Sequence, residues 1–569
     1  MTIRLLIICC FFLTKVSFSQ DKYLVFFTDK KDVESDYQNY FDNKALERRQ
    51  KLNLAFDHYT DLPLNQNYVE ALQIICDSIR YQFRWFNAVS CIINESDLKQ
   101  IKSLPFVKEI YRFEVQQVQL CENKTKELTH GQNLLAKSQL NRFNGLKFHE
   151  QGIKGKGIRI AILDAGFPKV DELDEFAHIR NRDGIIATYD FIKNKPNAYR
   201  GMQHGTMVLS NIAGLYQDSI PLGLALDADF LLARTESLLK EGISDEENWL
   251  AAVEWADKNG ADIINSSLGY TNRLYMRNDM DGQTSLVAKA ANIAASKGIL
   301  VINSAGNEGS NEWTTIGSPA DADSVLAVGG INPWTNMHTM WSSFGPSSDK
   351  RIKPNVCAYG HAIVVGKTGI KEVTGTSFAS PLTAGFAACA WQSDSTLSNM
   401  ELFEMIEESS DLYPYYDYAH GYGVPQADYF LERVSTPDTS FFIDTTASEI
   451  RVFIREKHFS YSSLPMANYY SDDENNLYVK DINGKNINMD NEVFIHFKDG
   501  NLNSKASGIR DSESSYFYYH LENNRGYLDV YYVLGVEQLN VLNYIIKPVD
   551  SGKTIRFYYK GFIQEYRIP

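Results

Sequence analysis

Residues 373–388 read VTGTSFASPLTAGFAA, a stretch in which Ser377 follows a glycine and a threonine and precedes a run of small side chains. Alanine, glycine and serine at this density predict a helix that packs too closely for larger side chains. Ser377 lies where that helix would begin. Helix N-termini present unpaired N–H groups and the positive end of the helix dipole, so this position suits an oxygen that becomes negative.

The surrounding region, from about residue 152 to 393, alternates short apolar runs with longer amphipathic stretches. The apolar runs are almost continuous, which is typical of parallel strands covered by helices on both faces. We therefore predict an α/β fold with a mostly parallel sheet. Its expected strands are residues 158–163, 230–233, 262–267, 299–303 and 325–329.

The two flanking regions differ from this pattern. Up to about residue 120, alternating strands at 23–27 and 87–93 and a helical pattern at 98–104 predict a small α+β unit. From about residue 437 onward, strands rich in Tyr, Phe, Ile and Val are separated by NG, DG and NNRG turns. This last part is predicted to be an all-β sandwich or jelly-roll-like module.

Residues 1–19 are predicted to be a signal peptide. Arg4 precedes the apolar run LLIICCFFL, and Ser17 and Ser19 have the spacing that a signal peptidase recognises. The run is too short to span a bilayer, and no later run reaches about 18 apolar residues. We therefore expect no transmembrane segment, and a product that is secreted or attached to the cell surface.

Charge and cysteine content argue against two classes of function. The formal net charge of -15 disfavours a nucleic-acid-binding protein, because phosphate neutralisation needs a basic surface. The cysteines after residue 19 are scattered without a CxxC pair, so neither a metal site nor a disulfide framework is predicted. No metal ligands and no required cofactor are expected. Structural calcium held by backbone carbonyls would leave little trace in the sequence.

Three polar residues lie where predicted strands end or a predicted helix begins. Asp164 directly follows the strand at 158–163, His204 opens an apolar helical stretch, and Asn307 follows the strand at 299–303. Each has an ordinary structural explanation as a capping aspartate, a capping histidine or a turn asparagine. In open parallel sheets, however, functional groups gather at the carboxyl ends of strands.

Together with Ser377, these residues supply every group that acyl transfer needs. The reaction requires a hydroxyl nucleophile, a histidine to take its proton, a carboxylate to orient the histidine and a donor for the oxyanion. The chain order Asp, His, Ser differs from that of α/β-hydrolases, which also need a GxSxG elbow that GTSFA lacks. The sequence therefore predicts an acyl-transfer enzyme of another type.

At these motifs the chain resembles the subtilases, the subtilisin-like serine endopeptidases. AILDAGF, HGTMVLSNIAG, SAGNEG and GTSFASPLTAGFAA are similar to the family's Asp, His, oxyanion and Ser motifs, and SSFGP and RIKPNVCAYG match familiar connections. The resemblance covers roughly residues 152–389 and implies a subtilisin-like three-layer fold. It implies that the nucleophile is Ser377, the general acid and base His204, the orienting carboxylate Asp164 and the side-chain oxyanion donor Asn307.

The resemblance also implies where a substrate binds. By this resemblance, the substrate backbone would pair with the strand formed by Ser267, Leu268 and Gly269. One wall of the primary specificity pocket would be formed by Ser304, Ala305 and Gly306.

Two positions depart from the common pattern of the family. Met207 stands where many subtilases have a second histidine, and Ala165 stands where many have a hydroxyl residue. The first change alters the surroundings of the histidine and the second removes a hydroxyl near the aspartate. Neither removes a reacting group.

By the same resemblance, residues 20–125 are expected to be a propeptide, an intramolecular chaperone and inhibitor that is cut off between about Phe113 and Thr129. The subtilisin-like peptidase domain would span residues 126–435 and the β-rich C-terminal domain residues 436–569. The expected partners are protein or peptide substrates and the chain's own propeptide.

Two other functions stay open at the level of the sequence. A catalytically inactive subtilase fold could serve as an adhesin, although all four reacting groups are present. The C-terminal β domain could instead make this a targeting protein, although aromatic strands more often form a core than a binding surface. Casein hydrolysis that disappears in Ser377→Ala would separate a peptidase from an adhesin.

Overall fold

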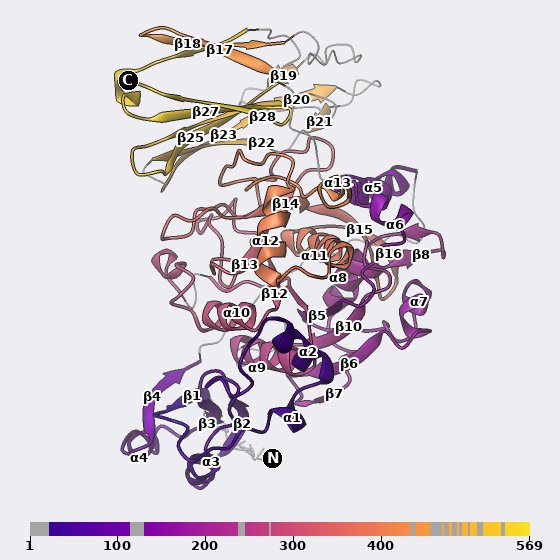
Figure 1. The fold of residues 1–569 in the computed structure, drawn as a ribbon, viewed down its shortest axis with the longest axis vertical. Coiled ribbons are helices and arrows are strands. Elements are labelled where there is room, and N and C mark those ends of the chain that lie inside the picture. The colour runs from indigo at the N-terminus through magenta and orange to yellow at the C-terminus, as the bar shows by residue number, and fades with distance from the viewer. Residues whose placement is uncertain are drawn as a thin grey trace, which may run out of the picture.

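The computed structural model describes residues 22–113, 130–236, 245–271, 275–432 and 439–455, together with 469–471, 477–480, 486–488, 492–498, 501–508, 516–535 and 541–569. The predicted signal peptide, and residues 114–129 of the predicted cleavage region, lie outside these ranges. Three parts follow one another along the long axis of the molecule: a small N-terminal unit, a large α/β body and a β-rich C-terminal part (Figure 1).

The N-terminal unit is the predicted α+β unit. Its four antiparallel strands pair in the order β2-β3-β1-β4 around their own apolar core. The expected strands at 23–27 and 87–93 are β1 and β3, and the expected helix after residue 98 is α4. The elements are β1 (Lys22–Phe27), α1 (Tyr37–Tyr40), α2 (Asn43–Lys51), α3 (Gln66–Gln73), β2 (Ser78–Phe83), β3 (Ala88–Ile92), α4 (Leu98–Lys102) and β4 (Val107–Arg112).

The α/β body is built on an eight-stranded sheet in the order β14-β13-β12-β11-β5-β10-β6-β7. Neighbouring strands are parallel except for the short β7, and all five apolar runs predicted as strands lie in this sheet. The strands are β5 (Arg159–Asp164), β6 (Ile185–Asp190), β7 (Lys195–Pro196), β10 (Asp229–Arg234), β11 (Ile263–Ser266), β12 (Leu300–Ser304), β13 (Val325–Ile331) and β14 (Val356–Tyr359).

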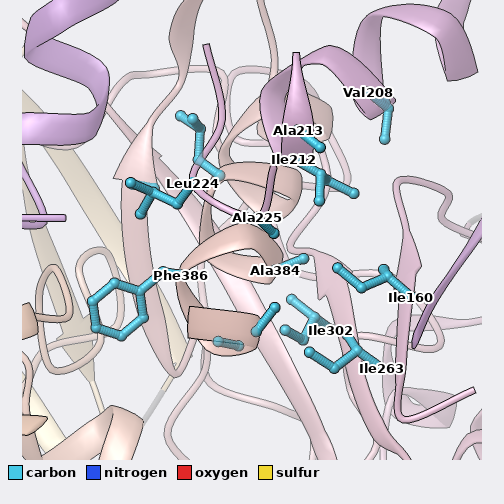
Figure 2. Close-up of a cluster of buried hydrophobic side chains, with 14 of the residues drawn as sticks. Ile160, Val208, Ile212, Ala213, Leu224, Ala225, Ile263, Ile302, Ala384 and Phe386 are labelled. Atoms are coloured by element: carbon cyan, nitrogen blue, oxygen red, sulfur yellow. The ribbon is translucent and has the colours of Figure 1, made fainter. Parts of the chain in front are cut away.

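Helices cover both faces of the sheet, so the body has three layers. Alternate side chains of β5 point to opposite faces: Ile160 and Ile162 join one core, while Ala161 and Leu163 join the other. The first core contains α8 (His204–Ala213) and α11 (Thr376–Ser393), and Figure 2 shows Ile160 and neighbouring strand residues in it. The second contains α9 (Asp245–Lys258) and α10 (Leu286–Ser296). This is the predicted subtilisin-like layering.

Helix α11 contains the stretch of small residues, and its packing explains their size. A Cβ placed on Gly385 would lie 3.0 Å from the carbonyl oxygen of Ile212 in α8, so this glycine lets the two helices approach closely. Cys389, further along α11, is fully buried in the same core as a small apolar side chain. The predicted helix and its close packing are confirmed.

Further short elements surround this body. They are α5 (His130–Asn141), α6 (Leu146–Glu150), α7 (Ala177–Arg180), β8 (Leu215–Tyr216), β9 (Ile220–Pro221), β15 (His361–Gly366), β16 (Gly369–Thr374), α12 (Asn399–Glu408) and α13 (Ala427–Glu432), with 3-10 turns at Asp174–Phe176 and Arg277–Asp279.

The C-terminal part contains two sheets that face each other across a shared apolar core. Phe441 and Ile450 of the three-stranded sheet β17-β18-β26 pack with Phe517 and Phe557 of the six-stranded sheet β23-β22-β25-β24-β27-β28, as a sandwich requires. A third small sheet is β19-β20-β21. The strands are β17 (Phe441–Thr445), β18 (Glu449–Ile454), β19 (Tyr469–Ser471), β20 (Leu477–Lys480), β21 (Asn486–Asn488), β22 (Glu492–Lys498), β23 (Asn501–Gly508), β24 (Tyr516–Glu522), β25 (Leu528–Gly535), β26 (Val541–Ile545), β27 (Thr554–Tyr559) and β28 (Phe562–Arg567).

Tyrosines join this sandwich to the α/β body. Tyr415 and Tyr418 of the body share an apolar cluster with Tyr518 and Tyr558 of the six-stranded sheet, and all four are buried. These strand tyrosines therefore contribute to cores, as expected for aromatic strands. Among the helices within the described ranges, none is both long and apolar enough to cross a membrane.

Candidate active site

The predicted reacting residues lie at the carboxyl edge of the sheet and at two helix starts. Asp164 is the last residue of β5, and Asn307 follows the end of β12. His204 is the first residue of α8, and Ser377 is the second residue of α11. Adjacent parallel strands bring Asp164 and the end of β12 to the same side of the molecule.

Asp164 and His204 form a buried pair. The Nδ1 atom of His204 lies 2.9 Å from each carboxylate oxygen of Asp164, which is fully buried. Because a carboxylate can only accept, Nδ1 carries the proton in this pair and Nε2 is left as an acceptor. Nε2 is buried and makes no hydrogen bond within the described ranges.

The electrostatic setting of His204 favours its protonated form. Burial alone lowers the pKa of an imidazole, but the neighbouring Asp164 carboxylate more than offsets this and raises the pKa of His204 above its ordinary value. The imidazole is therefore a stronger base than a histidine in water.

Met207, one of the two departures from the common pattern, packs with a phenylalanine that lies beside the imidazole. Met207 is buried in a small apolar cluster with Phe378, and the Phe378 ring lies 5.4 Å from the ring of His204. The methionine therefore contributes packing where a second histidine would have contributed a polar group.

Ser377 is held by a reciprocal pair of hydrogen bonds with Ser267. Pro381 has no N–H, so the carbonyl of Ser377 lacks the helical partner it would otherwise have, and the hydroxyl of Ser267 donates to it at 3.0 Å. In return, the hydroxyl of Ser377 donates to the carbonyl of Ser267 at 3.4 Å. The Ser377 hydroxyl is thus not bonded to His204 in this structure. Long or misaligned nucleophile–base contacts are common when no substrate is bound.

Asn307 is oriented by Thr376, a residue to which the sequence assigned no role. The Oδ1 atom of Asn307 accepts from the N–H and from the hydroxyl of Thr376, both at 3.0 Å. The Nδ2 atom faces the start of α11, where a Cβ on Gly375 would lie 3.7 Å away. Gly375 has φ +144°, a conformation that other residues rarely adopt. Only the position of Thr376 directly before the serine hints at this role in the sequence.

The two predicted binding segments follow neighbouring strands and are joined by Asn303. Its Nδ2 donates to the carbonyl of Leu268 at 2.9 Å and to that of Ser304 at 2.8 Å. The first segment lies just beyond β11, and its Ser267 and Leu268 are buried. A Cβ placed on Gly269 would meet no atom within 4 Å, so the chain borders open space at this residue. An extended peptide can pair with such an open edge of backbone.

The other binding segment turns sharply after β12. Ala305 is fully buried, and Gly306 has φ +109°, where an added Cβ would lie 2.7 Å from the hydroxyl of Ser343. That hydroxyl in turn accepts from the N–H of Glu308 at 3.0 Å. Glycine is thus required here to place Asn307. No group of three or more His, Cys, Asp or Glu side chains in the described part of the chain is arranged to hold a metal ion.

The chain is similar in sequence to known families and proteins. A family model described as "Subtilase family" matches residues 155–423, and a second, "Peptidase S8 propeptide domain, Bacteroidota", matches residues 22–131. The chain is 31% identical over 265 residues to "Subtilisin" of Bacillus pumilus, covering 46% of this chain and 86% of that protein. It is 28% identical over 335 residues to "Subtilisin NAT" of Bacillus subtilis subsp. natto, covering 58% and 77%. A solved cold adapted subtilisin-like serine proteinase is 21% identical, with 48% and 88% covered and a TM-score of 0.38.

Proposed function

The chain belongs to the subtilase family, and from this premise we propose that it is an exported endopeptidase that cuts peptide bonds through an acyl-enzyme on Ser377 and removes its own propeptide. It is a subtilisin-like serine peptidase with a propeptide domain. The observation that carries the detailed proposal is the bonded Asp164–His204 pair. Within the described ranges its Nε2 makes no hydrogen bond, and its ring lies 5.4 Å from the ring of Phe378, which directly follows Ser377 in α11.

The proposed first step forms the acyl-enzyme. The Ser377 hydroxyl oxygen attacks the carbonyl carbon of the scissile bond, and its proton moves to Nε2 of His204. The resulting oxyanion receives hydrogen bonds from Nδ2 of Asn307 and from the Ser377 N–H, which lies in the first turn of α11 and so has no helical acceptor. Collapse of this intermediate breaks the C–N bond, and the leaving amine takes the proton back from Nε2.

The proposed second step returns the free enzyme. A water molecule gives a proton to Nε2 of His204 and attacks the acyl carbon, and the Ser377 oxygen leaves with that proton. Throughout both steps Asp164 holds Nδ1–H in place and stabilises the imidazolium without itself taking the proton. Its full burial strengthens this interaction.

Substrates are proposed to bind as an added strand along Ser267, Leu268 and Gly269, with one side chain against the wall formed by Ser304, Ala305 and Gly306. The open space at Gly269 and the Asn303 bridge between the two segments support this arrangement. Backbone pairing tolerates many sequences, which suits an enzyme that acts on varied proteins. We propose no required cofactor, and any structural calcium remains a separate prediction.

The test compares casein hydrolysis by the processed protein with that by Ser377→Ala from which the N-terminal unit has been cut at an inserted foreign protease site and removed. We expect activity in the parent and its complete loss in the variant, because no other group supplies the nucleophile. Hydrolysis that persists in Ser377→Ala would overturn the assignment of the nucleophile. A parent chain that is correctly processed but inactive on every protein substrate would favour the adhesin or the targeting protein.

A further inference from the structure

Two of the scattered cysteines meet inside the N-terminal unit. Cys76 lies in the connection between α3 and β2, and Cys91 lies in β3. Both side chains belong to the apolar core of the unit, where Cys76 is 7% exposed and Cys91 is 1% exposed. A hydrogen bond joins the two thiols, which are not linked covalently in the structure. The two sulfur atoms are therefore close neighbours.

Backbone hydrogen bonds fix this meeting of the two cysteines. The N–H of Asp77 donates to the carbonyl of Ile92 at 3.0 Å, and each of these residues directly follows one of the two cysteines. On the helix side, the N–H of Cys76 donates to the carbonyl of Leu72 in α3 at 2.8 Å. The connection is thus tied to both α3 and β3, and the contact between the thiols follows from the path of the chain.

The cysteines of the α/β body have different surroundings. Cys357 and Cys389 are buried in the core that also contains α8 and α11. The Sγ atom of Cys389 donates to the carbonyl of Leu224 at 3.4 Å, and burial raises the pKa of both thiols. Both residues therefore behave as small, unreactive side chains. Cys121 lies outside the described residues.

The two thiols of the N-terminal unit differ in acidity. The hydrogen bond from Cys91 lowers the pKa of the Cys76 thiol below its usual value, and the same bond, together with burial, raises the pKa of Cys91. Because the thiolate is the reacting form, Cys76 is expected to attack an oxidant first. The connection around Cys76 also lies at the surface, since Asp77 is exposed and the Ile74 side chain is 86% exposed.

We propose that Cys76 and Cys91 are a redox pair, which closes to a disulfide when the chain meets an oxidant that itself carries a disulfide. The bond staples the connection after α3 to β3. The oxidising surroundings follow from the proposed export of the chain, because disulfides form and persist outside the reducing cytosol. In this one respect the inference rests on the proposed function. The arrangement of the thiols does not depend on it.

The reaction is thiol–disulfide exchange in two steps. The Cys76 thiol loses its proton and its sulfur attacks one sulfur of the oxidant, so the S–S bond of the oxidant breaks and one half leaves as a thiol with that proton. The Cys91 sulfur then attacks the Cys76 sulfur and displaces the other half, which takes the Cys91 proton. Two electrons pass from the cysteines to the oxidant, and one S–S bond forms for the one that breaks.

The bond should stabilise the N-terminal unit. It closes the chain over residues 76–91, which include β2 and β3, and so reduces the number of conformations open to the unfolded chain. Because β3 lies between β2 and β1 in the sheet, holding it in place supports the strands on both sides. We expect oxidation to raise the ratio of folded to unfolded N-terminal unit by roughly 30- to 1,000-fold.

The test looks for the bond directly. A purified full-length chain with Ser377→Ala is reduced, freed of the reductant and incubated with oxidised glutathione, and the remaining thiols are then alkylated in denaturant. Trypsin cuts after Arg80 and Arg84, which places the two cysteines in separate peptides, residues 52–80 and 85–99. We expect mass spectrometry of the unreduced digest to find these two peptides joined, and to find them separate after reduction.

The opposite outcome is equally clear. If both peptides carry alkylated cysteines, or if either cysteine is bonded to Cys121 instead, the proposal is wrong. This measurement changes neither cysteine of the pair, so it does not depend on the folding of a cysteine variant.

Two variants test the order of the steps and the specificity of the pair. Cys91→Ala should stop after the first step and keep glutathione on Cys76, because the thiol that displaces it is missing. An unmodified Cys76 in this variant would overturn its role as the attacking thiol. The matched control is Cys389→Ala, which removes a buried thiol of the α/β body. Its chain should form the bond as the parent does.

Amide hydrogen exchange measures the stabilisation. Adding dithiothreitol to the oxidised parent should speed exchange at the amides of β2 and β3, by up to roughly 1,000-fold. In a Cys91→Ala chain kept free of glutathione, the same addition should change nothing. Equal exchange in the oxidised and the reduced parent would show that the bond does not stabilise the unit.

Neither experiment depends on export or on catalysis, because the oxidant is added and Ser377 is replaced. Export is tested separately by the same digest of chains collected from the culture medium, which should contain the joined peptides. A chain that stays inside the cell would refute the proposed export and leave the glutathione result intact.

Discussion

Thr376 fixes which way the side-chain amide of Asn307 points. The N–H of Thr376 can only donate, so the side-chain atom that it contacts at 3.0 Å is the carbonyl oxygen, and the amide nitrogen must point the other way. The Thr376 hydroxyl adds a second bond to the same oxygen at 3.0 Å. An amide fixed in this way can donate without reorganising when a negative charge forms.

If Asn307 donates to the oxyanion, Asn307→Ala should lower kcat by roughly 100- to 1,000-fold and leave KM nearly unchanged, the range for loss of one such donor. Steady-state kinetics on a peptide substrate gives both constants. A loss confined to KM would instead make Asn307 a turn residue that shapes the pocket.

Thr376→Val should lower kcat by a smaller factor, roughly two- to tenfold, because it removes one neutral hydrogen bond and keeps the backbone N–H bond to Asn307. The same kinetics applies. In an Asn307→Ala background the threonine substitution should have little further effect, and two independent, multiplying losses would contradict the orienting role.

The activity should depend on the protonation of His204. The base must be neutral to accept the Ser377 proton, and the Asp164 carboxylate raises the pKa of His204 above its ordinary value of about 6.5. The rate should therefore rise with pH through an apparent pKa above that value, measured as kcat/KM across a pH series. Full activity at pH 4 is incompatible with this mechanism.

Ser377→Ala should accumulate as a precursor that begins near residue 20, whereas the parent should begin between about residues 114 and 130. Alanine fits the start of α11, because the carbonyl of Ser377 keeps its bond from Ser267. Mass spectrometry of the secreted proteins reports both ends. Loss of the N-terminal region from purified Ser377→Ala, without any other protease present, would show that processing is external.

Glu254 of α9 should help to hold the N-terminal unit on the α/β body. Its two carboxyl oxygens accept from the N–H groups of Arg84 and Trp85 at 3.0 Å each, and burial raises the pKa of Glu254 to about 8. Glu254→Ala removes both acceptors and leaves these two N–H groups without them. Once the chain between the N-terminal unit and the body has been cut, a labelled N-terminal fragment should therefore dissociate roughly 5- to 150-fold faster after dilution. Hydrolysis by the processed enzyme should be unchanged. Dissociation of the variant's N-terminal unit at the parental rate would show that Glu254 has no role in binding it.

The fold was largely predictable because its signals are local. The runs that form β5 and β12 are apolar at nearly every position, which predicts strands buried on both faces. The small residues after Ser377 predict the close packing of α11. Because the four predicted reacting residues lie at strand ends and helix starts, this fold brings them to one side of the molecule.

What the sequence did not reveal depends on contacts between distant residues. Arg49 of the N-terminal unit donates to the carboxylate of Asp257 in α9 at 2.6 Å, but the two residues are 208 apart in the chain, so no periodicity links them. The bonds between Ser267 and Ser377 span 110 residues and follow from the missing N–H of Pro381, which shows only once the helix is built. Neither pair of residues belongs to a repeating pattern, so a single sequence gives no sign that its members meet.

The placement of residues 36–61 of the N-terminal unit, which contain α1 and α2, also bears on how quickly the sheet can form. Pairing β5 with β11 brings Ile160 next to Ile263, so the long stretch of chain between them must close into a loop. Closing the loop costs chain entropy before any contact offsets it, and parallel sheets therefore fold slowly. Asp42 pairs with Arg159 at the start of β5, and Lys44 pairs with Asp262 just before β11. One short segment thus holds the starts of both strands together while they find their register. A chain that begins at residue 130 should therefore refold more slowly than the whole chain, because it lacks the segment that lowers this topological barrier.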